Sequence, residues 1–514
     1  MSRYNTKTVA KVQTVTNHQG GEGYKYDPKT EMVAILATGF DNTYYEKLSD
    51  RETRFKDLIV DIAKKEPEFV AKALVYARAV MGQRSVSQFG AVALTPLLSG
   101  RAIARRFFSK RDKKGNIGGI VFRLDDMLEI VACYQHFNPG KPLPNAMKKG
   151  FKAALEAADA YELAKYQGKN KQVSLVDVVN LVHPTPRETM QETFKQLMNG
   201  NLKQFNTVED KNTQAGQEVA KKVKEGKITK EQAQVELKEA KESNYAELIK
   251  TRKIGYLALL RNLRNILGTT NNAELIKEAC DILTDEKLIK QSLVFPHQID
   301  LALEVLIQEV GAQKALPFVK ACDKAYELSI PNLVELFSHG RTAVVFDSSG
   351  SMSSSIKLAN RNQGSKSAIE KAALIAATLG KAINADVYHF ADRCDAIKYN
   401  PLDSVNTLKN QFLAKQGVVG YGTNFTDIFN KVGGGKYDRV FVISDLQGNA
   451  YLERNAYKNT HVYSIDLVGY GTTMFKPGNR VYQLFGYTAE MYEMVKRVEL
   501  DPKAIIKAIE AIEI

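Results

Sequence analysis

The hydrophobic pattern of this 514-residue chain changes its period near residue 340. Before that point, apolar residues recur at helical spacing in segments of about 10–15 residues joined by short connectors. After it, short apolar runs alternate with helical stretches, which is typical of a doubly wound parallel sheet. The sequence therefore predicts a multidomain protein in which an α/β part follows an all-α part. The runs expected as strands are 342–347, 385–390, 439–445 and 461–468.

Three regions follow from this change of pattern. Residues 1–45 are polar and contain glycine, and we expect an N-terminal arm or short strands there. Residues 46–340 form the helical region, and residues 341–514 form the α/β domain with a terminal helix. The stretch 206–245 is highly charged with few apolar residues, so we expect a solvated helical insertion.

Composition limits the class of protein and its partners. The net charge is +14, which favours a polyanionic partner without locating a binding face. The chain contains no run of 18 apolar residues and no apolar segment near its start, so we expect neither a membrane span nor a secretory signal. Its four cysteines are scattered, as in a reduced cytoplasmic protein. We expect a cytoplasmic monomer with no membrane partner.

The apolar run that begins at Thr342 ends in a polar loop that carries Asp347, Ser349 and Ser351. A short run of β-branched and aromatic residues bounded by such a loop is typical of a buried parallel strand. The loop would then lie at the carboxyl edge of the sheet, where open α/β folds bind ligands. Carboxylate and hydroxyl oxygens are hard donors that suit Mg²⁺ or Mn²⁺.

Two later segments supply partners for this loop, since Thr423 lies in a glycine-flanked loop and Asp445 ends another predicted strand. This order of residues resembles the metal-ion-dependent adhesion site of von Willebrand factor A domains. The resemblance implies that Ser349, Ser351 and Thr423 contact the ion directly. It also implies that Asp347 and Asp445 act mainly through bound waters, with Mg²⁺ as the expected cofactor and Mn²⁺ as the alternative. Neutral hydroxyls leave such an ion under-neutralised and open to an outside anion.

Six segments of the chain, together with the A-domain motif, resemble the Ro autoantigen family of TROVE-module ribonucleoproteins. The likeness extends from about residue 40 to residue 498, and the charged stretch 206–245 has no counterpart in it. The first segment has Asp-Asn where the family often has Gly-Gly. The segments are DNTYY (41–45), LPNAMKK (143–149), SLVDVVNLVHP (174–184), ALLRNL (258–263), PHQIDLAL (296–303) and LFGYTA (484–489).

The Ro resemblance implies both a fold and a function. The fold is a ring of HEAT-like helical repeats, the TROVE module, closed by the A domain. Such a ring binds small structured non-coding Y-like RNA on its outer surface and the single-stranded 3′ ends of misfolded RNA in its central hole. The family acts in RNA quality control without known catalysis of its own, so a nuclease recruited through RNA or the A domain is a further expected partner.

Basic and aromatic side chains in the middle of the helical region are candidate RNA contacts. Lysine and arginine on helices can hold phosphates, and tyrosine can stack on a base. His183 matches a family histidine and can donate to phosphate or stack. The alternatives are ordinary surface charge for the lysines and a buried, hydrogen-bonded ring for His183. The candidates are Lys148, Lys149, Lys152, Lys165, Tyr166, Lys169, Lys171, His183 and Arg187.

Two other functions stay open on the sequence. A metal-dependent protein-binding adaptor would use the A domain to capture a partner's carboxylate, with the helices as a scaffold. A metal hydrolase would need a general base or a second cluster of carboxylates. Asp392 and Asp395 are the nearest candidates, and we interpret them as surface-loop residues. We therefore expect a binding protein and no enzyme.

Overall fold

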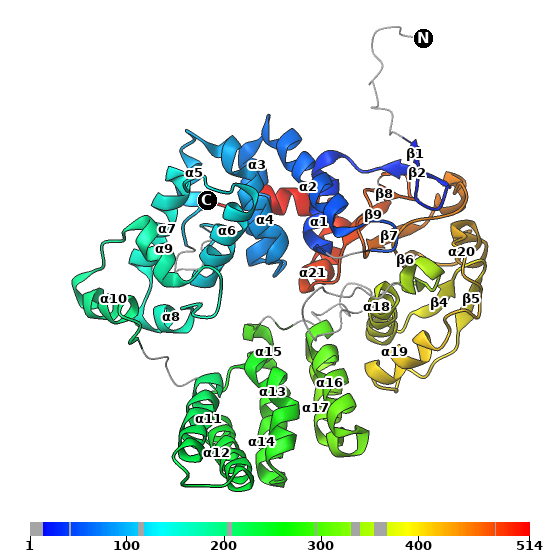
Figure 1. Cartoon of the computed structure of the whole chain (residues 1–514). Helices are drawn as coiled ribbons and strands as arrows, with labels where there is room; N and C mark the ends of the chain where they lie inside the picture. The colour runs from blue at the N-terminus through cyan, green and yellow to red at the C-terminus, as the bar shows by residue number, and fades with distance from the viewer. Residues whose placement is uncertain are drawn as a thin grey trace. The chain divides into compact units, whose positions relative to one another are not determined.

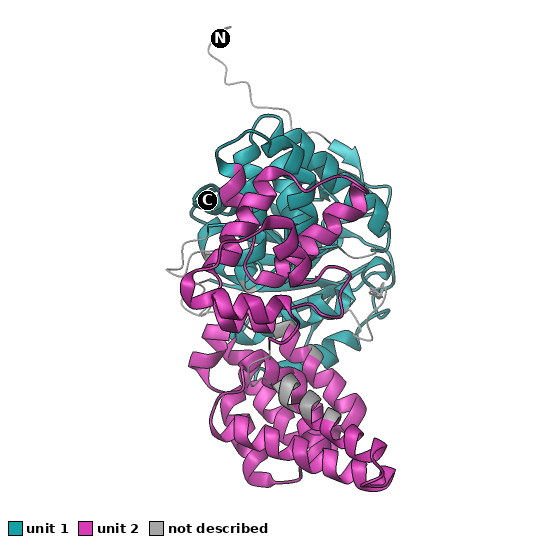
Figure 2. Ribbon diagram, turned by 60° about the vertical axis from the view of Figure 1, so that its left-hand side comes forward, with its two compact units in different colours: residues 1–103, 112–120, 332–514 teal, residues 104–111, 121–331 magenta. Residues whose placement is uncertain are grey.

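The computed structural model divides into two compact units, shown in teal and magenta in Figure 2. Unit 1 comprises residues 1–103, 112–120 and 332–514, and unit 2 comprises residues 104–111 and 121–331. The boundary predicted near residue 340 adjoins a stretch outside the described residues. The first four helices belong to the same unit as the α/β domain. The described residues are 14–40, 43–110, 118–202, 208–292, 294, 296–329, 340–353, 367–478 and 480–514.

Unit 1 contains a six-stranded sheet with strand order β5-β4-β3-β6-β7-β9, most of whose strands are labelled in Figure 1. All neighbouring strands are parallel except the edge strand β5, which is antiparallel to β4. The predicted doubly wound α/β domain is therefore confirmed, and β5 and β9 are additions to the four expected strands. The strands are β3 (Thr342–Asp347), β4 (Asp386–Phe390), β5 (Cys394–Ile397), β6 (Arg439–Ser444), β7 (His461–Asp466) and β9 (Val481–Phe485).

Helices cover this sheet because its central strands are apolar on both faces. Every residue of β3 is buried, and α18 packs against β3 and β6. The terminal helix α22 packs against α3, where Lys72 Nζ donates to the Glu510 carbonyl at 2.7 Å. The helices of unit 1 are α1 (Pro28–Thr38), α2 (Leu48–Ala63), α3 (Pro67–Ala79), α4 (Ser85–Leu94), α18 (Ala368–Ile383), α19 (Val405–Leu413), α20 (Phe425–Val432), α21 (Ala489–Val498) and α22 (Ala504–Glu510), with 3-10 turns at η1 (Thr95–Leu98), η4 (Gly350–Ser353) and η5 (Arg454–Tyr457).

A small antiparallel sheet joins the start of the chain to the α/β domain. It consists of β1 (Thr14–Thr16), β2 (Glu22–Lys25) and β8 (Thr472–Thr473), in that order. The predicted N-terminal arm thus contains a β-hairpin that pairs with a strand from the far end of the sequence, and it also contains α1. Residues 1–13 lie outside the described residues.

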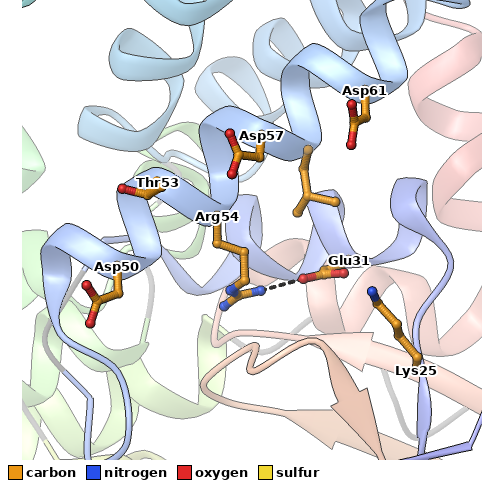
Figure 3. Close-up of a pocket in the computed structure, with 8 residues that line it drawn as sticks. Lys25, Glu31, Asp50, Thr53, Arg54, Asp57 and Asp61 are labelled. Carbon is orange, nitrogen blue, oxygen red and sulfur yellow. Dashed lines mark hydrogen bonds and ion pairs between the residues drawn. The ribbon is translucent and has the colours of Figure 1, made fainter.

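An ion-pair network anchors α1 and α2 to the loop that follows β7. Arg54 on α2 donates to Glu31 on α1 at 2.7 Å, as Figure 3 shows, and to the Gly469 carbonyl at 2.9 Å. Arg54 Nε also donates to Glu46 Oε1 at 2.8 Å. Arg51 is buried beside it and donates to the Gly39 carbonyl at 2.9 Å. Charge-assisted bonds of this kind fix the geometry of the contact.

The described residues of unit 2 form helices and no named strand, as the sequence predicts. Helices that follow one another pack together, including α11 with α12, α13 with α14, and α16 with α17 (Figure 1). The charged stretch forms the α11–α12 hairpin, which Lys222 and Glu236 bridge. The helices are α5 (Ile103–Phe107), α6 (Leu124–Phe137), α7 (Asn145–Ala157), α8 (Ala160–Lys165), α9 (Leu175–Val182), α10 (Gln191–Met198), α11 (Val208–Lys224), α12 (Lys230–Lys250), α13 (Tyr256–Thr269), α14 (Ala273–Leu283), α15 (Glu286–Ser292), α16 (Pro296–Val310) and α17 (Ala312–Leu328), with a 3-10 turn at η2 (Glu188–Met190).

Candidate functional site

The two aspartates expected at the metal site end neighbouring parallel strands. β3 and β6 pair in register at Phe346 and Ile443, so Asp347 and Asp445 leave the same edge of the sheet. Ser444 Oγ donates to Asp347 Oδ2 at 2.5 Å, which joins the two strand ends directly. Both carboxylates are buried.

The loop after β3 folds its hydroxyls back toward these carboxylates. The backbone N–H of Ser349 donates to Asp347 Oδ1 at 2.8 Å. The hydroxyl oxygens of Ser349 and Ser351 lie 3.3 Å apart, and the Ser351 side chain lies beside the Asp445 carboxylate. The alternation of serines therefore places two hydroxyls over the two carboxylates.

Thr423 reaches the same place from a third loop. The Gly350 N–H donates to the Tyr421 carbonyl at 3.0 Å, and the Asn449 N–H donates to the Thr423 carbonyl at 3.2 Å. These bonds hold the Thr423 loop between the loops that follow β3 and β6. The structure thus brings together all five predicted residues, and none of them is more than 5% exposed.

Asp392 positions the Thr423 loop, a role that its interpretation as a surface-loop residue missed. Its carboxylate accepts from the N–H groups of Tyr421 and Gly422, each at 3.1 Å. A Cβ at Gly420 would lie 1.8 Å from Asp392 Oδ2, and one at Gly422 would lie 2.1 Å from Oδ1. Both glycines are needed because the carboxylate approaches the backbone too closely for a side chain.

The electrostatics of this cluster suit a cation. Burial raises the pKa of Asp347 to about 6. Burial and the charge of Asp347 raise the pKa of Asp445 to about 8. Asp445 Oδ2 is buried without a hydrogen-bond partner among the described residues. Two crowded carboxyls, three hydroxyls and an unsatisfied oxygen fit a small divalent cation, which would favour ionisation of both acids.

The donor set also limits which cation fits. Among the described residues, no group of three or more His, Cys, Asp or Glu side chains is placed to hold a metal. The cluster depends instead on hydroxyl oxygens, which are hard donors suited to Mg²⁺ or Mn²⁺ and unlike the nitrogen and sulfur ligands of zinc sites.

Residues from the N-terminal part of unit 1 cover this cluster, and no sequence pattern indicates that they do so. Gln19, in the β1–β2 turn, donates from Nε2 to Thr423 Oγ1 at 3.1 Å. The Tyr45 hydroxyl lies within hydrogen-bonding reach of Ser351 and Gln19. Tyr45 belongs to the DNTYY segment, but that likeness implied no contact with the metal site, and Gln19 lies in no recognisable motif.

In unit 2, helix α7 carries the first group of predicted RNA contacts. Lys148 and Lys152 are one turn apart on it, and Lys149 is next to them. Lys149 is exposed, and Lys152 lies 3.8 Å from Glu156 in a partly exposed ion pair. Screened pairs of this kind contribute little stability, so Lys152 can exchange its partner for a phosphate.

The turn after α9 brings His183 and Arg187 to the carboxyl end of α7. His183 caps α9 in a left-handed conformation with φ of 48°, and its side chain is exposed. The Thr185 N–H donates to Glu156 at 2.8 Å, and Arg187 Nη2 donates to the Ala158 carbonyl at 3.1 Å. The alternative of a buried histidine is therefore wrong, and the ring is available for a ligand.

A second group surrounds Tyr166 at the end of α8. Lys165 Nζ lies 5.6 Å from the Tyr166 ring centre, and the guanidinium of Arg123 also lies at 5.6 Å. Lys165 also donates to the Tyr161 hydroxyl at 3.1 Å. Arg123 and Tyr161 were not predicted, because neither lies in a cluster of basic residues or in one of the segments that resemble the Ro family.

Lys169 and Lys171 lie beyond this group and are more constrained. Lys169 donates to the Gly200 carbonyl at 3.4 Å, and Lys171 forms an ion pair with Glu129 on α6. Both side chains stay exposed. They therefore add positive charge to the surface, but their present partners explain their positions without RNA.

Three comparisons with known proteins find similar sequences and a similar fold. A TROVE domain family profile matches residues 37–244. The chain is 22% identical over 356 residues to telomerase protein component 1 of Rattus norvegicus, which covers 57% of this chain but only 13% of that protein. Among solved structures, the Ro (RSR) protein of Deinococcus radiodurans matches 92% of this chain and all of its own, with 14% identity and a TM-score of 0.51. This last likeness concerns the fold.

Proposed function

We propose that the chain is a Ro-family TROVE protein and that it is an RNA-binding scaffold. RNA binding is the class of function that membership of this family indicates. The observation that supports it best is that the TROVE match, residues 37–244, includes both the α7 group and the Tyr166 group of basic side chains. The excess of positive charge, +14 over the chain, is consistent with a polyanionic partner.

The two basic groups suit different parts of an RNA molecule. Lysines on the rigid helix α7 can hold successive phosphates of a structured RNA. Tyr166, flanked by Lys165 and Arg123, offers an aromatic face with cations beside it, as single-stranded bases require. We therefore assign small Y-like non-coding RNA and the single-stranded 3′ ends of misfolded RNA as ligands, with a role in RNA quality control in the cytoplasm.

Binding, with no chemical step, is the activity that the described residues support. The clustered carboxylates of the metal site, Asp347 and Asp445, are buried with three hydroxyls. The hydrogen bonds that they accept include those from Ser349, Ser444 and Gln447, none of which is a general base. The residues that would hold Mg²⁺ are Ser349, Ser351 and Thr423, with the two aspartates behind them. When bound, such an ion would supply positive charge at the edge of the sheet. Among the described residues, no helix has the length and apolar character to cross a bilayer.

The test of RNA binding compares a structured RNA that carries a 3′ tail with the same RNA without it. We expect tighter binding of the tailed RNA and a linear fall of log affinity with log salt. The double variant Lys148→Ala/Lys149→Ala should reduce that slope by about 0.7–0.9 for each phosphate that is no longer neutralised. The matched control is Lys287→Ala/Lys290→Ala on α15, which removes two exposed lysines from the same unit. Weak, salt-independent binding of both RNAs would contradict the proposal.

The adaptor function remains a second candidate because the hydroxyl-rich site resembles those that capture carboxylates elsewhere. It requires the outer face of the cation to be open to a partner protein. Gln19 and Tyr45 lie on that face and contact Thr423 and Ser351 respectively. The contacts of these two residues therefore favour a different role for the site.

A further inference from the structure

The turn of the N-terminal hairpin is built onto the loop that follows the second metal-site aspartate. The Gly21 N–H donates to the Gly448 carbonyl at 3.2 Å, and the His18 N–H donates to Gln447 Oε1 at 3.1 Å. A Cβ at Gly21 would lie 2.4 Å from the Gly448 oxygen, so only glycine permits this approach. Gln447 in turn donates its own N–H to Asp445 at 3.1 Å. The hairpin is therefore hydrogen-bonded to the loop that carries Asp445.

Aromatic rings hold the turn in place above the site. The His18 ring stacks on Tyr45 with a centroid distance of 5.2 Å and packs edge-on against Tyr470 at 5.0 Å. The Tyr45 N–H donates to the Tyr470 hydroxyl at 3.3 Å. Stacked rings of this kind add stability beyond the area they bury. Gln19 follows His18 directly, so the ring contacts of His18 also fix the backbone from which the Gln19 side chain reaches Thr423.

Gln19 and Tyr45 together contact hydroxyls from two different loops of the metal site. Gln19 Nε2 bonds to Thr423 Oγ1 at 3.1 Å, and the Tyr45 hydroxyl reaches both Ser351 and Gln19. Asp347 and Asp445 lie at the strand ends. The Gln19 and Tyr45 side chains, which contact Thr423 and Ser351, therefore lie on the side of the metal site that faces away from the sheet. That face is where a cation with neutral hydroxyl ligands has a position to fill.

We propose that the Gln19 carboxamide takes the open position of the metal site, directly or through a bound water, so that the N-terminal hairpin closes the site against outside carboxylates. The inference depends on the proposed metal site. An amide offers a donor nitrogen and an acceptor oxygen, which exchange places when the group turns over. The nitrogen faces the lone pair of Thr423 in the structure. When the Thr423 hydroxyl gives that lone pair to a cation, the amide nitrogen loses its acceptor. The amide oxygen can then face the cation instead, because it carries lone pairs of its own.

Closure of this kind links cation binding to the order of the hairpin. A cation that binds only when the hairpin is docked stabilises the docked state by mass action. The backbone N–H groups of the hairpin, including the N–H of Gly21 that bonds to Gly448, should then exchange more slowly with deuterium when Mn²⁺ or Mg²⁺ is present. This protection is measured on the wild-type chain and needs no variant.

The affinity test uses calorimetric titration of the full chain with Mn²⁺. Gln19→Glu, which places a carboxylate oxygen where the amide lies, should bind the ion about tenfold more tightly. Gln19→Ala, which removes the oxygen, should bind it several-fold more weakly. The matched control is Asn410→Asp on α19, which makes the same amide-to-acid change at an exposed position of unit 1. Its affinity should equal that of the wild type.

The outcomes separate this inference from the metal site on which it depends. The metal site is supported if the wild type binds Mn²⁺ and Asp445→Asn abolishes that binding. The closure is nevertheless overturned if Gln19→Glu, Gln19→Ala and Asn410→Asp then bind Mn²⁺ with equal affinity and hydrogen exchange in the hairpin does not change. No Mn²⁺ binding by the wild type would overturn both. Tighter binding by Gln19→Glu alone, with slower exchange in the hairpin, supports the closure.

Discussion

A single glycine in α7 offers a test of how the lysine-bearing helix is seated in unit 2. A Cβ built at Gly150 would lie 2.6 Å from the Phe108 Cβ, 2.7 Å from its carbonyl carbon and 2.8 Å from its oxygen. Phe108 is fully buried, and its ring packs edge-on against Phe151 at 6.0 Å. Two of the three atoms in the way are backbone, so they cannot rotate aside.

The expected size of the effect follows from two opposing contributions. Alanine is favoured over glycine inside a helix by about 1 kcal/mol. Forcing an extra methyl group into a packed site costs about 1–3 kcal/mol, and an immovable backbone neighbour places this site toward the upper end. We therefore expect Gly150→Ala to lower the free energy of unfolding by about 1–2 kcal/mol. Because α7 must shift to relieve the contact, RNA affinity should fall as well.

The matched control is Gly268→Ala in α13, where no atom lies within 4 Å of the added Cβ. It should stabilise unit 2 by up to about 1 kcal/mol, since only helix propensity acts there. Urea unfolding followed by circular dichroism gives the two midpoints, and hydrogen exchange of the α7 amides shows whether the loss is local. If Gly150→Ala proves as stable as Gly268→Ala, the close seating of α7 on Phe108 is wrong.

Two further predictions concern the ion-pair network and the aromatic group. Burial raises the pKa of Glu46, but Arg54 and Arg51 outweigh it and hold that pKa below its usual value. A depressed folded pKa stabilises the fold above the unfolded pKa of about 4.3 and loses that contribution as pH falls through the folded pKa. Glu46→Gln should therefore show a smaller loss of melting temperature than the wild type between about pH 5 and pH 3, and identical profiles would contradict the network. Tyr166→Leu should weaken binding of a single-stranded RNA by about 1–3 kcal/mol while leaving the salt slope unchanged, as filter binding can measure; a changed slope with unchanged affinity at low salt would exclude stacking.

The strands that the sequence predicted are those whose signal is local. Each of β3, β4, β6 and β7 contains a short run rich in β-branched and aromatic residues, and β3, which is buried along its whole length, needs no partner to be recognised. The missed strands β5 and β9 lie at the two edges of the sheet, and β5 has only four residues. β1 and β2 lie within residues 1–45, where short strands are one of the two expectations, but the pairing of β2 with β8 spans the length of the chain and has no local pattern.

The metal-site residues could be expected together because the topology of a parallel sheet brings its loops to one edge. Asp347 and Asp445 follow neighbouring strands, and this adjacency depends only on strand order. No comparable rule of topology predicts which of the candidate RNA-binding residues in the helical region lie together on its surface. His183 is a predicted RNA contact with a buried ring as the alternative, and its exposure depends on the left-handed turn after α9 and on the bond from Thr185 to Glu156. Neither of these is visible in the spacing of residues.

The contact between Gln19 and Thr423 joins residues that are 404 positions apart in the sequence. Contacts of this kind explain why the boundary predicted from hydrophobic periodicity differs from the division into two compact units. Periodicity separates helical from α/β sequence near residue 340, because it reports only local structure. The contacts that attach residues 1–103 to the α/β domain include the β2–β8 pairing, the Arg54 bond to Gly469, and the turn at Gln19. The first two hold without a cation. The third meets the metal site itself, so cation binding would strengthen an attachment that the fold already makes, and the site would serve the protein's own chain before any outside partner.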